Sequence, residues 1–91
     1  MDKIEKILSR WTKPKPLEKL TDVLLVLSHY HFEYEVQGSH YIAKHPLLKE
    51  YYSEFGRGGI VNIPTVRGRD VKRCYIKKLM KAISIIEEVM D

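Results

Sequence analysis

The residues of this chain with the clearest chemical potential are Ser39 and His40, which directly follow Gly38. Glycine and serine between two extended segments are typical of a tight turn, here between residues 32–37 and 40–44. A histidine ring titrates near neutral pH, so it can take or give a proton without special tuning. The neighbouring serine adds a hydroxyl that can orient a phosphate or the ring. The triplet therefore predicts acid–base chemistry at one end of a β-hairpin.

Unbalanced positive charge, which could stabilise a phosphate, is concentrated in the C-terminal half of the chain. Between Gly56 and Lys81 there are eight basic residues and one acid, Asp70, although the formal net charge of the whole chain is only +4. A positive face of this kind favours a partner that carries phosphates, whereas the alternative interpretation is a solvated helix surface. The basic residues are Arg57, Arg67, Arg69, Lys72, Arg73, Lys77, Lys78 and Lys81.

Together these residues match the requirements of RNA cleavage. The reaction needs a base for a ribose 2′-hydroxyl, an acid for the leaving oxygen and cations for the charged phosphorane. His40 is the candidate base or acid. Lys44 is predicted to lie on the same strand face as His40, because side chains alternate along a strand. The candidates for RNA binding are Ser39, Lys44, Arg67, Arg69, Lys72 and Arg73.

Metal chemistry has little support in the sequence. A zinc site from His29, His31, His40 and His45 would require convergence across the sheet, and the spacing fits no zinc template. His29 and His31 end a predicted helix, where the dipole favours a cation. We therefore expect no metal and no other cofactor.

The length of 91 residues predicts one small domain with a single core. A surface site for a large partner is more compatible with this size than a deep pocket. No apolar run is long enough to span a bilayer, and the first residues lack the pattern of a signal peptide. The single cysteine, Cys74, excludes an internal disulfide. We expect a cytoplasmic protein without a membrane partner.

Hydrophobic periodicity predicts the elements that position these residues. Helices are predicted over 2–11, over 17–28 and from a start between 70 and 76 to about 89, and strands over 32–37, 40–44 and 60–63. Pro14 and Pro16 are expected to end the first helix, with Pro16 in the first turn of the next. Residues 47–55 could form a helical turn or extend the hairpin.

The predicted fold class is α+β, with a three-stranded antiparallel sheet covered by helices on one face, as in double-stranded-RNA-binding domains. Residues 1–15 are interpreted as a helical extension outside the core, and residues 16–91 as the domain. The second and last helices are expected to pack on the first strand. The residues expected in this contact are Leu24, Leu27, Phe32, Tyr34, Val36, Leu79 and Ile83.

The run from Pro16 to about Ile86 resembles the HicA-type (YcfA-like) toxins, the small mRNA interferases of type II toxin–antitoxin pairs. The shared pattern is a Leu-rich first helix, a strand that opens with Phe32, and then the Gly-Ser-His triplet. A third strand that ends in Pro64, a basic loop and a helix follow. The helix positions that match are Ile76, Leu79 and Met80.

The resemblance implies a fold like that of a double-stranded-RNA-binding domain, metal-independent cleavage of mRNA with His40 as the catalytic histidine, and a HicB-like antitoxin protein as partner. The chain departs from the pattern in its N-terminal helix, in Thr65-Val66 before Arg67, and in an insertion over 47–59 that is expected to narrow or redirect substrate access. A non-catalytic RNA-binding module of the same fold is the alternative. A DNA-binding or purely interaction domain also stays open.

Overall fold

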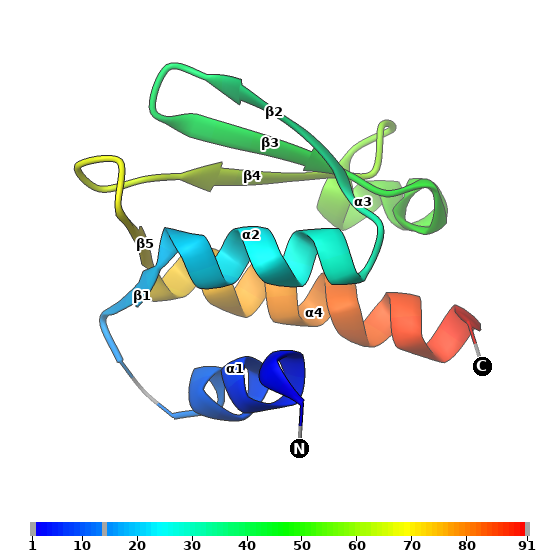
Figure 1. Ribbon diagram of the computed structural model, residues 1–91. Coiled ribbons are helices and arrows are strands. Elements are labelled where there is room, and N and C mark those ends of the chain that lie inside the picture. Colours follow the sequence, from blue (N-terminus) through cyan, green and yellow to red (C-terminus); the bar gives the residue numbers. More distant parts are fainter. Residues whose placement is uncertain (1, 14, 91) are drawn as a thin grey trace.

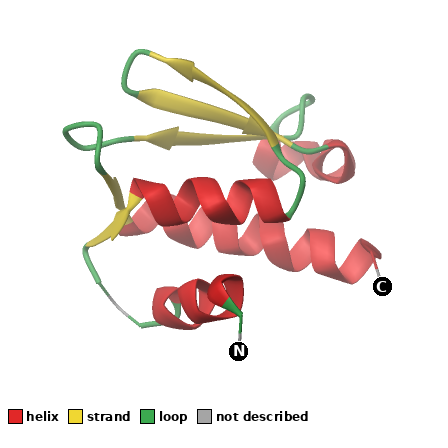
Figure 2. Ribbon diagram, in the orientation of Figure 1, coloured by secondary structure: helices red, strands yellow, loops and turns green. Residues whose placement is uncertain are grey.

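The computed structural model describes residues 2–13 and 15–90, so Pro14 lies outside the described residues. A three-stranded antiparallel sheet has the strand order β2-β3-β4, and two long helices cover one of its faces (Figures 1 and 2). This arrangement confirms the predicted α+β class. The strands are β2 (Glu33–Gln37), β3 (His40–Lys44) and β4 (Ile60–Pro64), and the helices on the sheet are α2 (Leu20–His29) and α4 (Arg73–Met90).

The N-terminal helix α1 (Lys3–Trp11) lies against the two covering helices, on the side away from the sheet (Figure 1). The expectation that it lies outside the core is wrong, because Ile7 and Trp11 are fully buried in the same cluster as residues of α2 and α4. Arg10 forms a 2.9 Å ion pair with Asp22 of α2, and the Arg73 guanidinium donates to the Trp11 carbonyl. Helix α1 therefore closes the core beneath α2 and α4.

Residues 17–19 form a short strand instead of the first turn of the second helix. Strand β1 (Leu17–Lys19) pairs antiparallel with β5 (Asp70–Lys72), and Glu18 faces Val71 in the register. The Leu20 amide then donates to the Arg69 carbonyl at 2.8 Å. Helical spacing of the leucines extends into this segment, but pairing with a strand some fifty residues later satisfies its backbone instead.

The hairpin is less buried than the alternation of strand β2 predicts. Tyr34 and Val36 are 41% and 55% exposed to solvent. Of the three apolar residues on this face, only Phe32, which precedes the strand, is buried. The reason is position, since β2 is an edge strand that extends beyond the covering helices (Figure 1). The strand residues that fill the core come from the next two strands. They are Ala43, Val61 and Ile63, which are buried together with the expected Leu27, Leu79 and Ile83, while Leu24 is half-buried.

The insertion folds into the 3₁₀ helix η1 (Pro46–Tyr51) and the short helix α3 (Tyr52–Phe55). It packs against α4, where Glu54 pairs with Lys81 at 2.6 Å and the Lys78 ammonium lies 5.7 Å from the centre of the Phe55 ring. It thus forms helical turns rather than a longer hairpin. Among the described residues, no helix is long and apolar enough to cross a membrane.

Candidate functional site

His40 is the first residue of β3, and it lies on the face of the sheet that the helices leave open. Along β3, Ala43 is buried toward the helices, so the alternating positions of His40, Ile42 and Lys44 share the open face. The turn before His40 has two residues, Gly38 and Ser39, because Gln37 pairs directly with His40. Gly38 has a φ of +61°, which an L side chain adopts only with strain. The predicted hairpin edge thus presents a half-exposed imidazole.

The ring of His40 is oriented by Asn62 of the neighbouring strand. His40 Nδ1 lies 3.2 Å from Asn62 Oδ1. An amide oxygen can only accept, so this contact favours the proton on Nδ1 and leaves Nε2 as a free acceptor. Sequence reasoning missed Asn62, although its place between the buried Val61 and Ile63 indicates an outward-facing side chain. The side-chain contact between Asn62 and His40 could not be predicted from the sequence alone. It depends on the register of the two strands, in which the Cα partner of Asn62 is Ile42.

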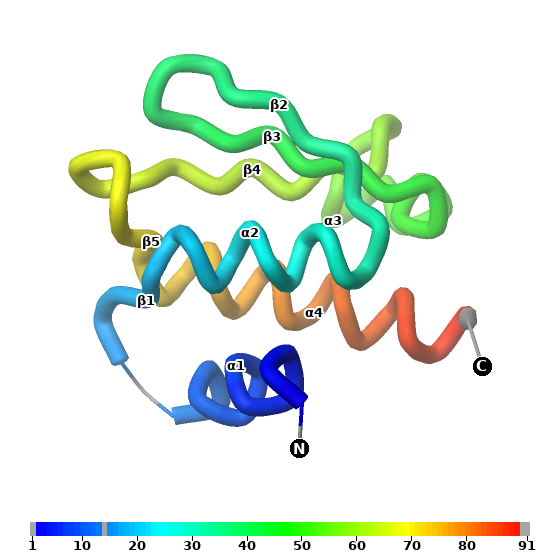
Figure 3. Tube along the Cα trace, in the orientation of Figure 1, coloured from blue at the N-terminus to red at the C-terminus, as the bar shows by residue number. Residues whose placement is uncertain are grey.

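Thr65 joins the basic loop to the hairpin turn. Both its backbone amide and its hydroxyl donate to the Ser39 carbonyl, each at 2.8 Å. Arg67 follows two residues later and is exposed, so its Cα lies within about 7 Å of the Thr65 Cα. The turn that holds Ser39 and leads into His40 and the loop that holds Arg67 therefore lie at the same end of the sheet (Figure 3).

A shallow groove of about 280 Å³ adjoins this end of the sheet. Its lining comes from the end of β4, the loop, the last residue of β5 and the first turn of α4. Pro64 in this lining is the cross-strand neighbour of His40, although the His40 side chain is not itself part of the lining. Lys72 and Tyr75 supply a cation and a phenol ring. The lining residues are Pro64, Thr65, Val66, Lys72 and Tyr75.

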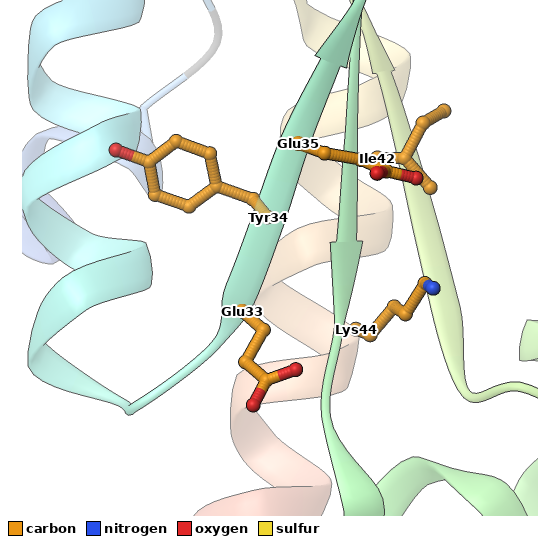
Figure 4. Close-up of a pocket in the computed structure, with 5 residues that line it drawn as sticks. All are labelled: Glu33, Tyr34, Glu35, Ile42 and Lys44. Atoms are coloured by element: carbon orange, nitrogen blue, oxygen red, sulfur yellow. The ribbon is translucent and has the colours of Figure 1, made fainter.

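Lys44 is not part of this cluster. It is four residues from His40 along β3, which is about 13 Å in an extended strand. Its cross-strand neighbour is Glu33, and both line a separate small hollow with Glu35 and Ile42 (Figure 4). Two carboxylates beside Lys44 disfavour a phosphate there.

Arg69 and Arg73 also lie away from the imidazole. Arg69 faces the start of α2, where it lines a different hollow with Leu20 and Gly68. Arg73 donates to the Trp11 carbonyl and so holds helix α1. Lys78 and Lys81, which contributed to the predicted positive face, contact Phe55 and Glu54 of the insertion. The basic segment is thus divided between holding the fold and presenting charge. Of the predicted ligands, Arg67 lies in the loop that is tied to the Ser39 turn, and Lys72 lines the groove with Pro64.

The insertion does not border this site. Strand β3 starts at His40 and ends at Lys44, and η1 follows directly at Pro46, so the insertion lies at the opposite end of the sheet (Figure 1). The expected narrowing of substrate access by this segment is therefore not found at His40.

The remaining histidines do not join His40. His45 is buried, and its Nε2 contacts the Tyr30 carbonyl at 3.0 Å while its Nδ1 accepts from the Leu47 amide at 3.2 Å. His29 and His31 are exposed at the end of α2. Within residues 2–13 and 15–90, no group of three or more histidine, cysteine or acidic side chains is arranged to hold a metal ion.

The site can exchange a proton with a polyanion that lies over this end of the open sheet. It can also place positive charge beside such a polyanion. Its parts are an oriented half-exposed imidazole, a serine hydroxyl, and the cations of Arg67 and Lys72. The likeness to toxins described above rests on the residues quoted for it. No family model, no curated protein and no solved structure matches the chain.

Proposed function

We propose that this protein is a metal-independent endoribonuclease of the HicA-toxin kind, which cleaves mRNA at a site centred on His40. The observation that carries the proposal is the pair of contacts at one end of the sheet. Asn62 orients the His40 ring, and Thr65 ties the loop of Arg67 to the Ser39 turn. The Gly-Ser-His resemblance supports the same assignment.

The geometry suggests the following reaction. Nε2 of His40 takes the proton of a ribose 2′-hydroxyl, and the 2′ oxygen then attacks the adjacent phosphorus. The bond between phosphorus and the 5′ oxygen breaks. That oxygen takes a proton from water as it leaves, and the protonated His40 returns its proton to the solvent. The products are a 2′,3′-cyclic phosphate and a 5′-hydroxyl. Arg67 and Lys72 stabilise the charge of the phosphorane, and the Ser39 hydroxyl orients the phosphate.

A ribonuclease of this kind requires control in the cell. The resemblance supplies it in the form of a HicB-like antitoxin that binds the toxin and blocks it, with both proteins in the cytoplasm, where mRNA is translated. A HicB-like reading frame next to the gene for this chain would support the pairing. The proposal needs no cofactor.

The test compares the parent protein with His40→Ala. We expect the variant to lose RNA cleavage by about 100- to 10,000-fold, the usual contribution of one acid–base group, while its thermal unfolding and RNA binding stay close to those of the parent. His29→Ala is the matched control, because His29 is exposed at the end of α2. Cleavage by the parent is expected to persist in EDTA.

Two results would contradict the proposal. Equal cleavage by His40→Ala and the parent would exclude the catalytic role of His40. Binding without cleavage by a well-folded parent, across RNAs of varied sequence, would favour the non-catalytic RNA-binding module. That alternative uses the same groove and cations but leaves the oriented imidazole without a purpose.

A further inference from the structure

Strand β2 is an exposed sheet edge with two chemically different faces. Every residue from Glu33 to Gln37 is exposed, and within the described part of the chain the strand pairs only with β3. Its other edge therefore presents unpaired backbone amides and carbonyls. Proteins usually protect such edges with charged side chains, proline, bulges or a covering segment. Here the charges are the carboxylates of Glu33 and Glu35, which disfavour an acidic strand at this edge but not a basic one.

The face of β2 toward the helices is apolar but incompletely covered. Tyr34 projects from the strand toward α2 (Figure 4), and its ring lies 5.9 Å from that of Tyr41. Val36 follows on the same face and is the more exposed of the two apolar residues. An added strand would bring its own apolar side chains alongside Tyr34 and Val36.

The opposite face of the same strand is acidic. Glu33 and Glu35 lie on the open face of the sheet with Ile42 and Lys44 (Figure 4). The Gln37 amide donates to Glu35 at 3.2 Å, and the Glu35 side chain extends toward Ile42 of β3 (Figure 4). Lysine or arginine directly opposite Glu33 and Glu35 on an added strand would form favourable cross-strand pairs.

We propose that β2 is the docking edge for an extended segment of a partner protein, which adds a fourth strand to the sheet. The segment alternates basic residues, which face Glu33 and Glu35, with aliphatic residues, which pack beside Tyr34 and Val36. Backbone hydrogen bonds supply affinity, and the alternating side chains supply specificity. The contact does not use His40, so it can be tested separately from RNA cleavage.

The charges argue against the two other occupants of this edge. RNA would bring phosphates against Glu33 and Glu35, and like charges repel. A second copy of the chain, paired antiparallel through β2 about Glu35, would place Glu35 opposite Glu35 and Glu33 opposite Gln37. Like charges directly opposite each other destabilise a strand pair. A basic and aliphatic segment from a different protein is the occupant that these charges favour.

The experiment titrates the ¹⁵N-labelled full chain with two synthetic ten-residue peptides, one of alternating lysine and valine and one of alternating glutamate and valine, up to millimolar concentration. We expect the lysine peptide to shift the backbone amide signals of residues 33–37 and slow their hydrogen exchange, while the glutamate peptide has no effect. In Glu33→Lys/Glu35→Lys the preference is expected to reverse. Glu50→Lys/Glu88→Lys, which makes the same change of charge at exposed positions on η1 and α4, is expected to keep the parent's preference.

Several outcomes would overturn the proposal: no shift at residues 33–37 with either peptide, shifts confined to another surface, or the same preference in the parent and in the charge-reversed variant. Perturbation of these amides by RNA, or self-association that Val36→Lys abolishes, would assign the edge to another occupant. If the charge-reversed variant does not fold, Glu33→Gln/Glu35→Gln replaces it. That variant is expected to lose the lysine-peptide shifts without gaining any with the glutamate peptide.

Discussion

At the scale of single residues, His40 at the start of β3 and His45 just after its end have different roles, because their surroundings differ. His40 has one ring nitrogen held by Asn62 and the other free for a proton transfer. Both ring nitrogens of His45 are engaged, because Nδ1 accepts from Leu47 and Nε2 therefore donates to the Tyr30 carbonyl. Burial lowers the pKa of His45, and the nearby His31 lowers it further, against the opposing effect of the bond to Tyr30. His45 is thus a neutral structural residue that caps η1.

The lowered pKa of His45 predicts that folding stability falls in mild acid. Above the unfolded-state pKa of about 6.5, His45 is neutral in both states and its contribution is complete. As the pH falls below this value toward the folded-state pKa, the unfolded chain binds more protons and stability is lost. Denaturant unfolding of the parent and of His45→Asn, which retains a capping side chain, should show a shallower loss between pH 7.5 and 5 in the variant. Equal pH dependence of the two proteins would contradict this role.

At the scale of elements, the sequence predicts those whose signals are local. The periodicity of Ile4, Ile7 and Trp11 gives α1, that of Ile76, Leu79 and Ile83 gives α4, and the Gly-Ser turn and Pro46 bound β3. The pairing of β1 with β5 and the exposure of β2 could not be predicted in this way. Both depend on which distant segment lies alongside, and this information is absent from a local window of sequence.

Two glycines at turns offer a test of how the elements are joined. Gly38 and Gly59 both have positive φ, but a Cβ on Gly38 would meet no atom within 4 Å, whereas on Gly59 it would lie 2.7 Å from the His45 carbonyl oxygen and 3.0 Å from the Lys49 nitrogen. We expect Gly38→Ala to cost about 1–2 kcal/mol through backbone strain alone. Gly59→Ala is expected to cost about 1–3 kcal/mol more, because η1 must move.

Urea unfolding of the two alanine variants measures this difference directly. Similar stabilities for both variants would show that η1 does not pack tightly on the Gly59 turn. Gly38 precedes the candidate site, whereas Gly59 lies in the connection before β4, at the opposite end of the sheet. Gly59→Ala is therefore also expected to leave RNA cleavage at the parent's level per folded molecule.

At the scale of the whole molecule, the fold places the parts of the site at one end of the sheet and several basic residues elsewhere. The hairpin turn of Ser39 and the loop of Arg67 share one end of the sheet, as expected for a turn and a loop after the third strand of a meander. The sequence could not separate Arg67 and Lys72 from Arg73, Lys78 and Lys81, since only packing shows which cations are used to hold α1 and the insertion.

This division predicts how RNA affinity depends on salt. Each phosphate contact on a single strand contributes about 0.7 to the slope of log affinity against log salt, so Arg67→Ala/Lys72→Ala should reduce the slope by about 1.4. Lys3→Ala/Lys6→Ala removes the same charge from exposed positions on α1 and should leave the slope nearly unchanged. Binding of a short RNA is measured at several salt concentrations. An equal effect of both pairs would indicate attraction to net charge rather than a site at this end of the sheet.

The most direct test of the account is the chemistry of the cut ends. A defined RNA is incubated with the parent protein, the cleavage position is mapped, and the ends are identified by mass spectrometry. The same RNA with a single 2′-deoxyribose at that position serves as the matched substrate. If His40 activates the 2′-hydroxyl, the parent leaves 2′,3′-cyclic phosphate and 5′-hydroxyl ends, and neither the deoxy-substituted RNA nor the His40→Ala protein gives cleavage there. Ends with a 3′-hydroxyl and a 5′-phosphate, or cleavage of the deoxy-substituted position, would contradict the proposed role of His40.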